Sequence, residues 1–145
     1  MRLSKNFKLA ELTRSATADR LGVANTLNEN EVKNLEMLAE RVLQPIRDLF
    51  GVPVSITSGF RNEQVNRAVG GVETSQHRSG QAADFRVSGL NAREAFNRII
   101  ASGTIPFDQI ILYDDGRNNF VHASFNPQRA KQRGEILFSR NTPRQ

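Results

Sequence analysis

The apolar pattern of this chain changes its period at Gly51, and this change limits the folds that the chain can adopt. Before Gly51, apolar residues recur at helical spacing and predict one long core helix, with Val32, Leu35, Ala39, Val42, Ile46 and Leu49 on its buried face. Asn28 and Glu31 stand at capping-box spacing at its start, and Pro45 predicts a kink near its last turn. After Gly51, short runs alternate between apolar and polar residues, which is typical of strands.

These alternating runs predict a small sheet. Strands are expected at 52–58, 82–87, 110–113, 120–125 and 135–139, with a short helix over 63–69 and another that Asn91 opens. Such a mixture predicts an α+β fold with a mostly antiparallel sheet and helices on one face. At 145 residues the chain is expected to form a single domain over 1–139. Residues 1–27 are expected to form an arm packed on it, and residues 140–145 a flexible tail without an apolar anchor.

Composition narrows the possible partners. The chain carries a formal net charge of +5 and a pI near 10.4, which favours an anionic partner such as nucleic acid, a membrane surface or a bacterial wall polymer. A nucleic-acid interface is disfavoured, because the Lys and Arg residues are dispersed and the chain has no Trp and one Tyr. The first residues lack the apolar core of a secretory signal, and no stretch approaches the ~18 apolar residues of a membrane span. We therefore expect a monomer made in the cytoplasm, with no membrane span.

The two histidines of the chain are candidate metal ligands. Because the chain has no cysteine, any metal must be held by histidine and carboxylate. His77 precedes Asp84 across a glycine-containing turn, and alternation places Asp84 and His122 on the more polar faces of their strands. Two imidazoles and one carboxylate leave the fourth tetrahedral position of zinc open for water, as in catalytic sites. From spacing alone, hydrogen-bonded structural histidines remain an equal alternative.

Three segments resemble a known family. The segment Ser75–Asp84 resembles the Ser-x-His-x-x-Gly-x-Ala-x-Asp signature of the zinc D-alanyl-D-alanine carboxypeptidase and L,D-endopeptidase family, which includes phage endolysins. The preceding Thr57–Asn62 resembles the Ser-Gly-Tyr/Phe-Arg segment of that family, and Val121–Ser124 resembles its last ligand strand. The resemblance spans about half of the chain. It implies the fold shared by these peptidases and Hedgehog proteins, with a zinc groove on the sheet face that the helices leave free.

The resemblance also implies roles for single residues. It assigns one zinc ion per chain to His77, Asp84 and His122. Arg61 would pair with a substrate carboxylate or carbonyl; the alternative is a solvated turn residue that pairs with Glu63. Two residues beside the first ligand would hydrogen-bond the substrate backbone or merely shape the turn, namely Ser75 and Gln76.

The general base is the open part of this assignment. Many relatives carry Glu or Asp three residues before the last histidine ligand, where this chain has Asn119. The resemblance to a Tyr/Trp-Glu-x-Gly segment in some short members places Asp114 in the role, with Asp115 as second choice. The alternative is that Asp114 and Asp115 only build a hairpin turn.

The expected activity is hydrolysis of an amide bond in peptidoglycan stem peptides or cross-bridges. The zinc would polarise the carbonyl and activate water, Asp114 would move the proton, and Arg61 would position the substrate. A phage or prophage lysin released by another protein, or a virion-associated enzyme, would suit a chain without a secretory signal. The rival expectation is a non-catalytic zinc-containing module of the same fold that binds the cell wall or another protein.

Overall fold

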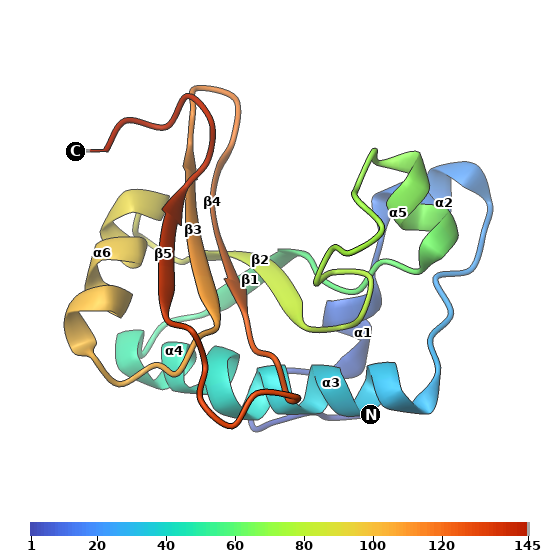
Figure 1. Cartoon of the computed structure of the whole chain (residues 1–145), viewed down its shortest axis with the longest axis horizontal. Coiled ribbons are helices and arrows are strands. Elements are labelled where there is room, and N and C mark those ends of the chain that lie inside the picture. The colour runs from blue at the N-terminus through green and yellow to red at the C-terminus, as the bar shows by residue number, and fades with distance from the viewer. Residues whose placement is uncertain (145) are drawn as a thin grey trace.

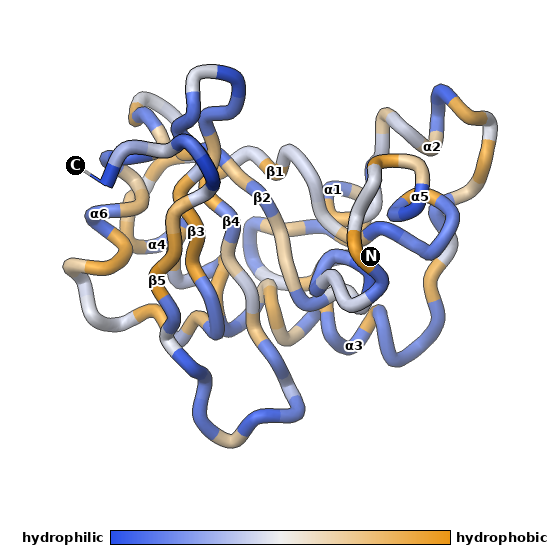
Figure 2. Tube along the Cα trace, turned by 45° about the horizontal axis from the view of Figure 1, so that its top comes forward, coloured by the Kyte–Doolittle hydropathy of each residue, from blue (hydrophilic) through white to orange (hydrophobic). Residues whose placement is uncertain are grey.

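A five-stranded sheet forms the centre of the computed structural model, which describes residues 1–144 (Figure 1). The strands follow the order β1-β2-β4-β3-β5, with bounds Val54–Ser58, Ala82–Val87, Asn119–Ser124, Gln109–Asp114 and Glu135–Phe138. All neighbouring pairs are antiparallel except β3 and β5, whose apolar stretches lie side by side in Figure 2. The predicted α+β fold with a mostly antiparallel sheet is therefore confirmed.

The long helical segment follows its predicted course up to the region before Pro45. It begins as α3 (Glu29–Leu38), where Asn28 and Glu31 form the expected reciprocal capping box. The next five residues, Ala39–Leu43, form a π-helical turn, and α4 (Gln44–Phe50) completes the segment. The π-helical turn, with its wider hydrogen-bond pairing, thus lies just before the proline, which has no N–H to donate. Gly51 ends the segment in the left-handed conformation at φ 66°.

One face of the sheet packs on helices. The helix α6 (Ala92–Ser102), capped by Asn91, lies against β2, β3 and β4. Its buried side chains join those of α3, the π turn, α4 and the inner sheet face in one apolar core. Core residues on the strands include Phe85, Ile110, Leu112 and Val121, none of which has exposed surface. The opposite sheet face carries the polar strand residues and is not covered by α6.

The N-terminal arm is part of this core. It contains two short helices, α1 (Leu9–Thr13) and α2 (Ala16–Leu21), and three of its side chains belong to the core cluster: Leu3, Phe7 and Leu12. Backbone bonding ties the arm to the strand end, because the Phe60 amide donates to the Leu12 carbonyl at 2.7 Å. The remaining helix, α5 (Glu63–Ala68), follows that strand end.

The last described residues make contacts with the body of the chain. Thr142 is buried, and its hydroxyl accepts a hydrogen bond from the Asp114 amide at 3.0 Å. Arg93 donates to the Pro143 carbonyl at 2.7 Å, and the Arg144 guanidinium lies over the Phe138 ring. Residue 145 lies outside the described residues. Within residues 1–144, no helix has the length and apolar character that crossing a bilayer requires.

Candidate metal centre

Neighbouring strands place two of the candidate ligands opposite each other. In the register of β2 and β4, Asp84 pairs with His122, and both side chains leave the sheet on the face opposite the core. The Nδ1 atom of His122 lies 2.9 Å from Oδ1 of Asp84. The alternation predicted from the sequence is therefore what brings these two groups together.

The third candidate ligand comes from the loop before β2. Nε2 of His77 lies 3.2 Å from the same Oδ1 atom of Asp84. The other ring nitrogen, Nδ1, donates to the Gly59 carbonyl at 2.7 Å. This bond orients the ring so that Nε2 faces the cluster, which is the usual outer support of a metal-bound histidine.

The three groups fit a divalent metal. One ligand atom from each of His77, Asp84 and His122 lies within 4.8 Å of the others, and both imidazoles are buried. Burial raises the pKa of the Asp84 carboxyl, but hydrogen bonds from His122 and His77 outweigh that effect and hold the pKa well below its usual range. The carboxylate is thus ionised and the donor set is two imidazoles and one carboxylate, which suits zinc.

Arg61 lies beside the cluster. Its amide donates to the His77 carbonyl at 2.9 Å, and Nη2 donates weakly to the Ser75 hydroxyl at 3.4 Å. Burial lowers the pKa of the guanidinium, whereas the charge of Asp84 opposes this shift. Glu63, the partner in the alternative assignment, instead pairs with Arg67 at 2.7 Å. Arg61 therefore keeps a buried Nε donor without a partner among the described residues.

A groove of about 470 Å³ opens next to His122. Its lining is mostly hydroxyl and amide side chains from the His77 loop, β3 and the segment after β4: Val72, Thr74, Ser75, Gln76, Gln81, Gln109, Ile111, His122, Asn126 and Arg133. Ser75 and Gln76 thus lie at the groove, as a substrate-binding role requires. They also shape the loop, because the Ser75 hydroxyl accepts from the His77 amide at 3.2 Å.

The structure does not bring Asp114 to the cluster. Asp114 follows Ile110 and Leu112 on the helix-covered face of β3, and Nε of Arg93 from α6 donates to its carboxylate at 3.2 Å. Asn119 lies opposite it on β4, donates to the same carboxylate, and accepts a bond from the Ala92 amide at the start of α6. The Asn119 side chain is therefore engaged at the N-terminus of α6.

Asp115 is committed to the hairpin between β3 and β4. Its carboxylate accepts from the Arg117 and Asn118 amides at 3.0 and 2.8 Å, and the bonds with Asn118 are the largest cause of its lowered pKa. These contacts are those of the turn alternative. Neither acidic candidate for the general base lies at the cluster.

Sequence reasoning missed Asp108. Its side chain has no exposed surface and binds two segments that rim the groove: Nη2 of Arg133 donates to it at 2.7 Å and Nε2 of Gln76 at 3.2 Å. The available signal was a single acid within the apolar run from Ile105 to Leu112. Such an acid is buried only with partners, and the sequence did not reveal Arg133 as that partner.

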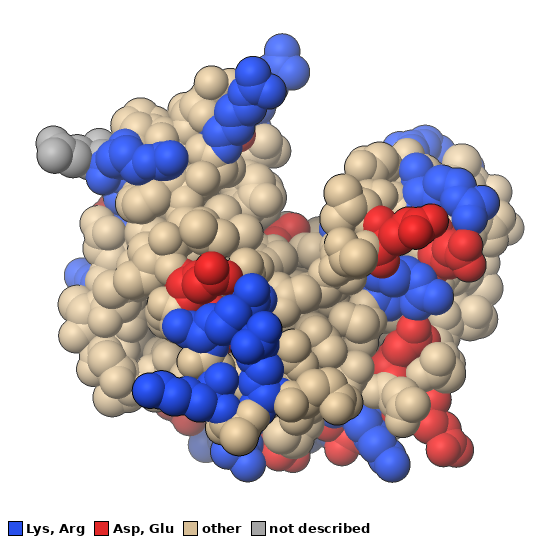
Figure 3. All heavy atoms as spheres, in the orientation of Figure 1, with Lys and Arg blue, Asp and Glu red and all other residues tan. Residues whose placement is uncertain are grey.

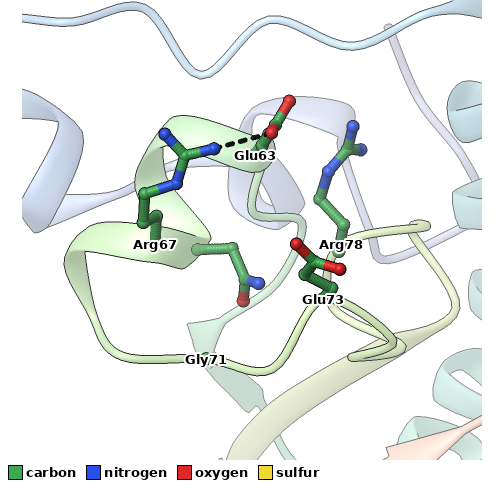
Figure 4. A pocket seen from close by; sticks show the side chains of 6 residues that line it. Glu63, Arg67, Gly71, Glu73 and Arg78 are labelled. Atoms are coloured by element: carbon green, nitrogen blue, oxygen red, sulfur yellow. Dashed lines mark hydrogen bonds and ion pairs between the residues drawn. The ribbon is translucent and has the colours of Figure 1, made fainter.

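A second hollow, of about 410 Å³, lies between α5 and the loop that follows it (Figure 4). It is lined by Glu63, Asn66, Arg67, Gly71, Glu73 and Arg78, and none of the three cluster residues contributes to it. Its cations are already paired, Arg67 with Glu63 and Arg78 with Glu31 at 2.6 Å. The groove beside His122 is therefore the better candidate for chemistry.

The mixed sheet carries two imidazoles and one carboxylate beside a polar groove. Three protein ligands next to a groove are the arrangement of a metal-dependent hydrolase. The comparison with protein families narrows this class. The chain belongs to the Peptidase M15 family, whose model matches residues 5–124, and it is a metallopeptidase in this general sense. No curated protein matches the chain. The family assignment agrees with the resemblance seen in the sequence.

Proposed function

We propose that this peptidase hydrolyses amide bonds in peptidoglycan stem peptides or cross-bridges, with one zinc ion held by His77, Asp84 and His122. The observation that carries the proposal is the convergence of these groups within 4.8 Å beside the polar groove. When bound, zinc supplies a Lewis acid for the carbonyl and an activated water. Amide and hydroxyl groups in the groove suit the backbone of a peptide.

The residues of the chain would divide the remaining tasks. Arg61, whose buried Nε has no partner within residues 1–144, would hold a carboxylate or carbonyl of the substrate. Ser75 and Gln76 would bind its backbone along the groove. His77 would stay oriented by its bond to the Gly59 carbonyl while the substrate binds.

The net positive charge supports a wall substrate. On the face drawn in Figure 3, Lys and Arg side chains gather in several places with Asp and Glu between them. The total of +5 would favour binding to an anionic polymer such as the bacterial wall. Lysis of the wall by a phage or prophage protein is the biological setting that we propose.

The test combines metal analysis with product analysis. Protein purified without added metal should contain about one zinc per chain, and Asp84→Asn should contain almost none. Wild type should release new amino termini from purified peptidoglycan, and mass spectrometry of the fragments should identify the bond. Asp115→Asn, which changes only a turn carboxylate, is the matched control and should retain metal and activity. A zinc-loaded wild type that cleaves no wall type would refute the peptidase proposal.

A second candidate is a non-catalytic zinc module that binds the wall or another protein. It is favoured by the engagement of Asp114 with Arg93 and of Asp115 with the hairpin, which leaves neither acid at the cluster. This candidate predicts stoichiometric zinc and wall binding without fragment release. The same experiment therefore separates the two functions.

A further inference from the structure

Tyr113, the one tyrosine of the chain, lies on the groove side of β3. In the register of β3 and β4, Ile111 lies opposite His122, so the two residues share the face that carries the cluster. Tyr113 is two residues further along β3 and returns to this face, whereas Asp114 points to the other one. Diagonal neighbours across an antiparallel pair are within reach of an aromatic side chain. The alternation along β3 thus places the Tyr113 side chain on the cluster side of the sheet and the Asp114 carboxylate on the side of α6.

Packing holds the Tyr113 ring in place. It lies opposite Phe120 and stacks on that ring, with 4.4 Å between centroids and 17° between planes. The tyrosine is half-buried, and the stacking on Phe120 restricts the orientation of its ring. A fixed ring is what a hydrogen-bond donor needs in order to act without reorganisation.

The charges around Tyr113 include two of the site and, as the smallest contribution, the turn carboxylate of Asp115. Burial raises the pKa of its hydroxyl, the carboxylate of Asp84 raises it further, and the Arg61 guanidinium opposes the rise. The phenol is therefore within electrostatic reach of Asp84 and Arg61, and it keeps its proton at neutral pH.

We propose that Tyr113 is a catalytic residue whose hydroxyl donates a hydrogen bond to the carbonyl oxygen of the substrate as water adds to the carbonyl carbon. The inference rests on the proposed peptidase function and adds a donor to Arg61. As the C–O bond forms, the carbonyl electron pair moves onto the oxygen and the hydrogen bond stabilises that charge. When the C–N bond breaks, the pair returns to restore the carbonyl, and the amine leaves with the proton of the water. Tyr113 forms no covalent bond and keeps its own proton.

Tyr113→Phe is the decisive variant, because it removes one hydroxyl and retains the ring that stacks on Phe120. In zinc-loaded protein, kcat should fall about 100-fold, as for the loss of one oxyanion donor. KM, zinc content and Tm should stay at wild-type values. The control is Asp19→Asn, which changes an exposed carboxylate on α2 and should retain wild-type kcat.

A second readout does not need turnover. A phosphinate peptide, whose oxygens imitate the attacked carbonyl, should bind zinc-loaded Tyr113→Phe about 100-fold more weakly than wild type, measured by calorimetry. Equal affinity for the phosphinate in the two proteins would overturn the role of Tyr113. If wild type cleaves no peptide but its phosphinate affinity depends on the hydroxyl, the peptidase proposal fails and the donor role stands. A zinc-loaded wild type that does not bind the phosphinate would overturn both.

Discussion

Asp108 shows how one buried carboxylate can organise the surroundings of a site. The carboxylate accepts two hydrogen bonds from the Arg133 guanidinium and one from the Arg133 amide. It also accepts a hydrogen bond from Nε2 of Gln76, the residue next to a candidate metal ligand. A carboxylate without exposed surface is tolerable only with such partners. We expect its contribution to stability to be large and to depend on pH.

Asp108→Asn should lower the free energy of unfolding by about 3 kcal/mol at pH 7, because it leaves Arg133 without its buried counter-charge. Hydrogen bonds from Arg133 hold the pKa of Asp108 below its usual range. The carboxylate therefore stabilises the fold above the unfolded-state pKa of about 3.9, and this contribution is lost as pH falls towards the lower folded-state value. Urea unfolding at pH 7 and pH 3 should show the gap between wild type and variant narrowing in acid.

The exposed Asp19 offers a control for this prediction. Asp19→Asn should change the unfolding free energy by less than about 0.5 kcal/mol at either pH. If the difference in unfolding free energy between wild type and Asp108→Asn stayed constant from pH 7 to pH 3, lost packing and not lost charge would cause the effect.

At the scale of elements, the turn that connects His77 to β2 depends on Gly80. This residue has φ +77°, and a Cβ placed on it would lie 2.8 Å from the Glu31 carbonyl oxygen of α3. The turn is thus pressed against the first helix of the core segment. Its shape sets the distance between the first ligand and the strand that carries Asp84.

Gly80→Ala should destabilise the fold by about 3 kcal/mol and weaken zinc binding, since it adds a backbone clash to the cost of a left-handed alanine. Gly116→Ala is the matched control: φ is +90° there, but no atom lies within 4 Å of the added Cβ, so only the ~1–2 kcal/mol conformational cost remains. Chemical unfolding and zinc titration of both variants would test this. Equal losses in the two variants would contradict the clash.

The elements were largely predictable from the sequence, and the pairing between them was not. Caps at Asn28 and Asn91 and alternation along β2 and β4 are local signals, so the helix starts and the faces of Asp84 and His122 followed from short windows. The role first given to Asp114 shows the limit. Its face depends on the register of β3 against β4, which is set by contacts between distant segments. The π turn before Pro45 was likewise not predicted, because the spacing of apolar residues does not distinguish it from an α-helical turn.

For the whole molecule, net charge leads to a prediction about wall binding. Because attraction to an anionic polymer is screened by salt, binding to insoluble peptidoglycan should fall severalfold between about 50 mM and about 500 mM NaCl. Hydrolysis of a short uncharged peptide by the same protein should change less than about twofold. Pelleting assays and peptide cleavage across the salt series would measure both. Wall binding that is insensitive to salt would instead indicate recognition by groove contacts.

The spread of the candidate ligands along the chain has a consequence for folding. The two imidazoles come from a loop and a strand separated in sequence by the strand of Asp84 and by α6, and all three groups meet only in the folded chain. A metal ion there would join positions 77 and 122 in the folded chain only, so its binding free energy would stabilise the fold. In a chain without cysteine, the ion would act as the cross-link that a disulfide provides elsewhere. Loss of the ion would then lower the stability of the fold as well as the activity.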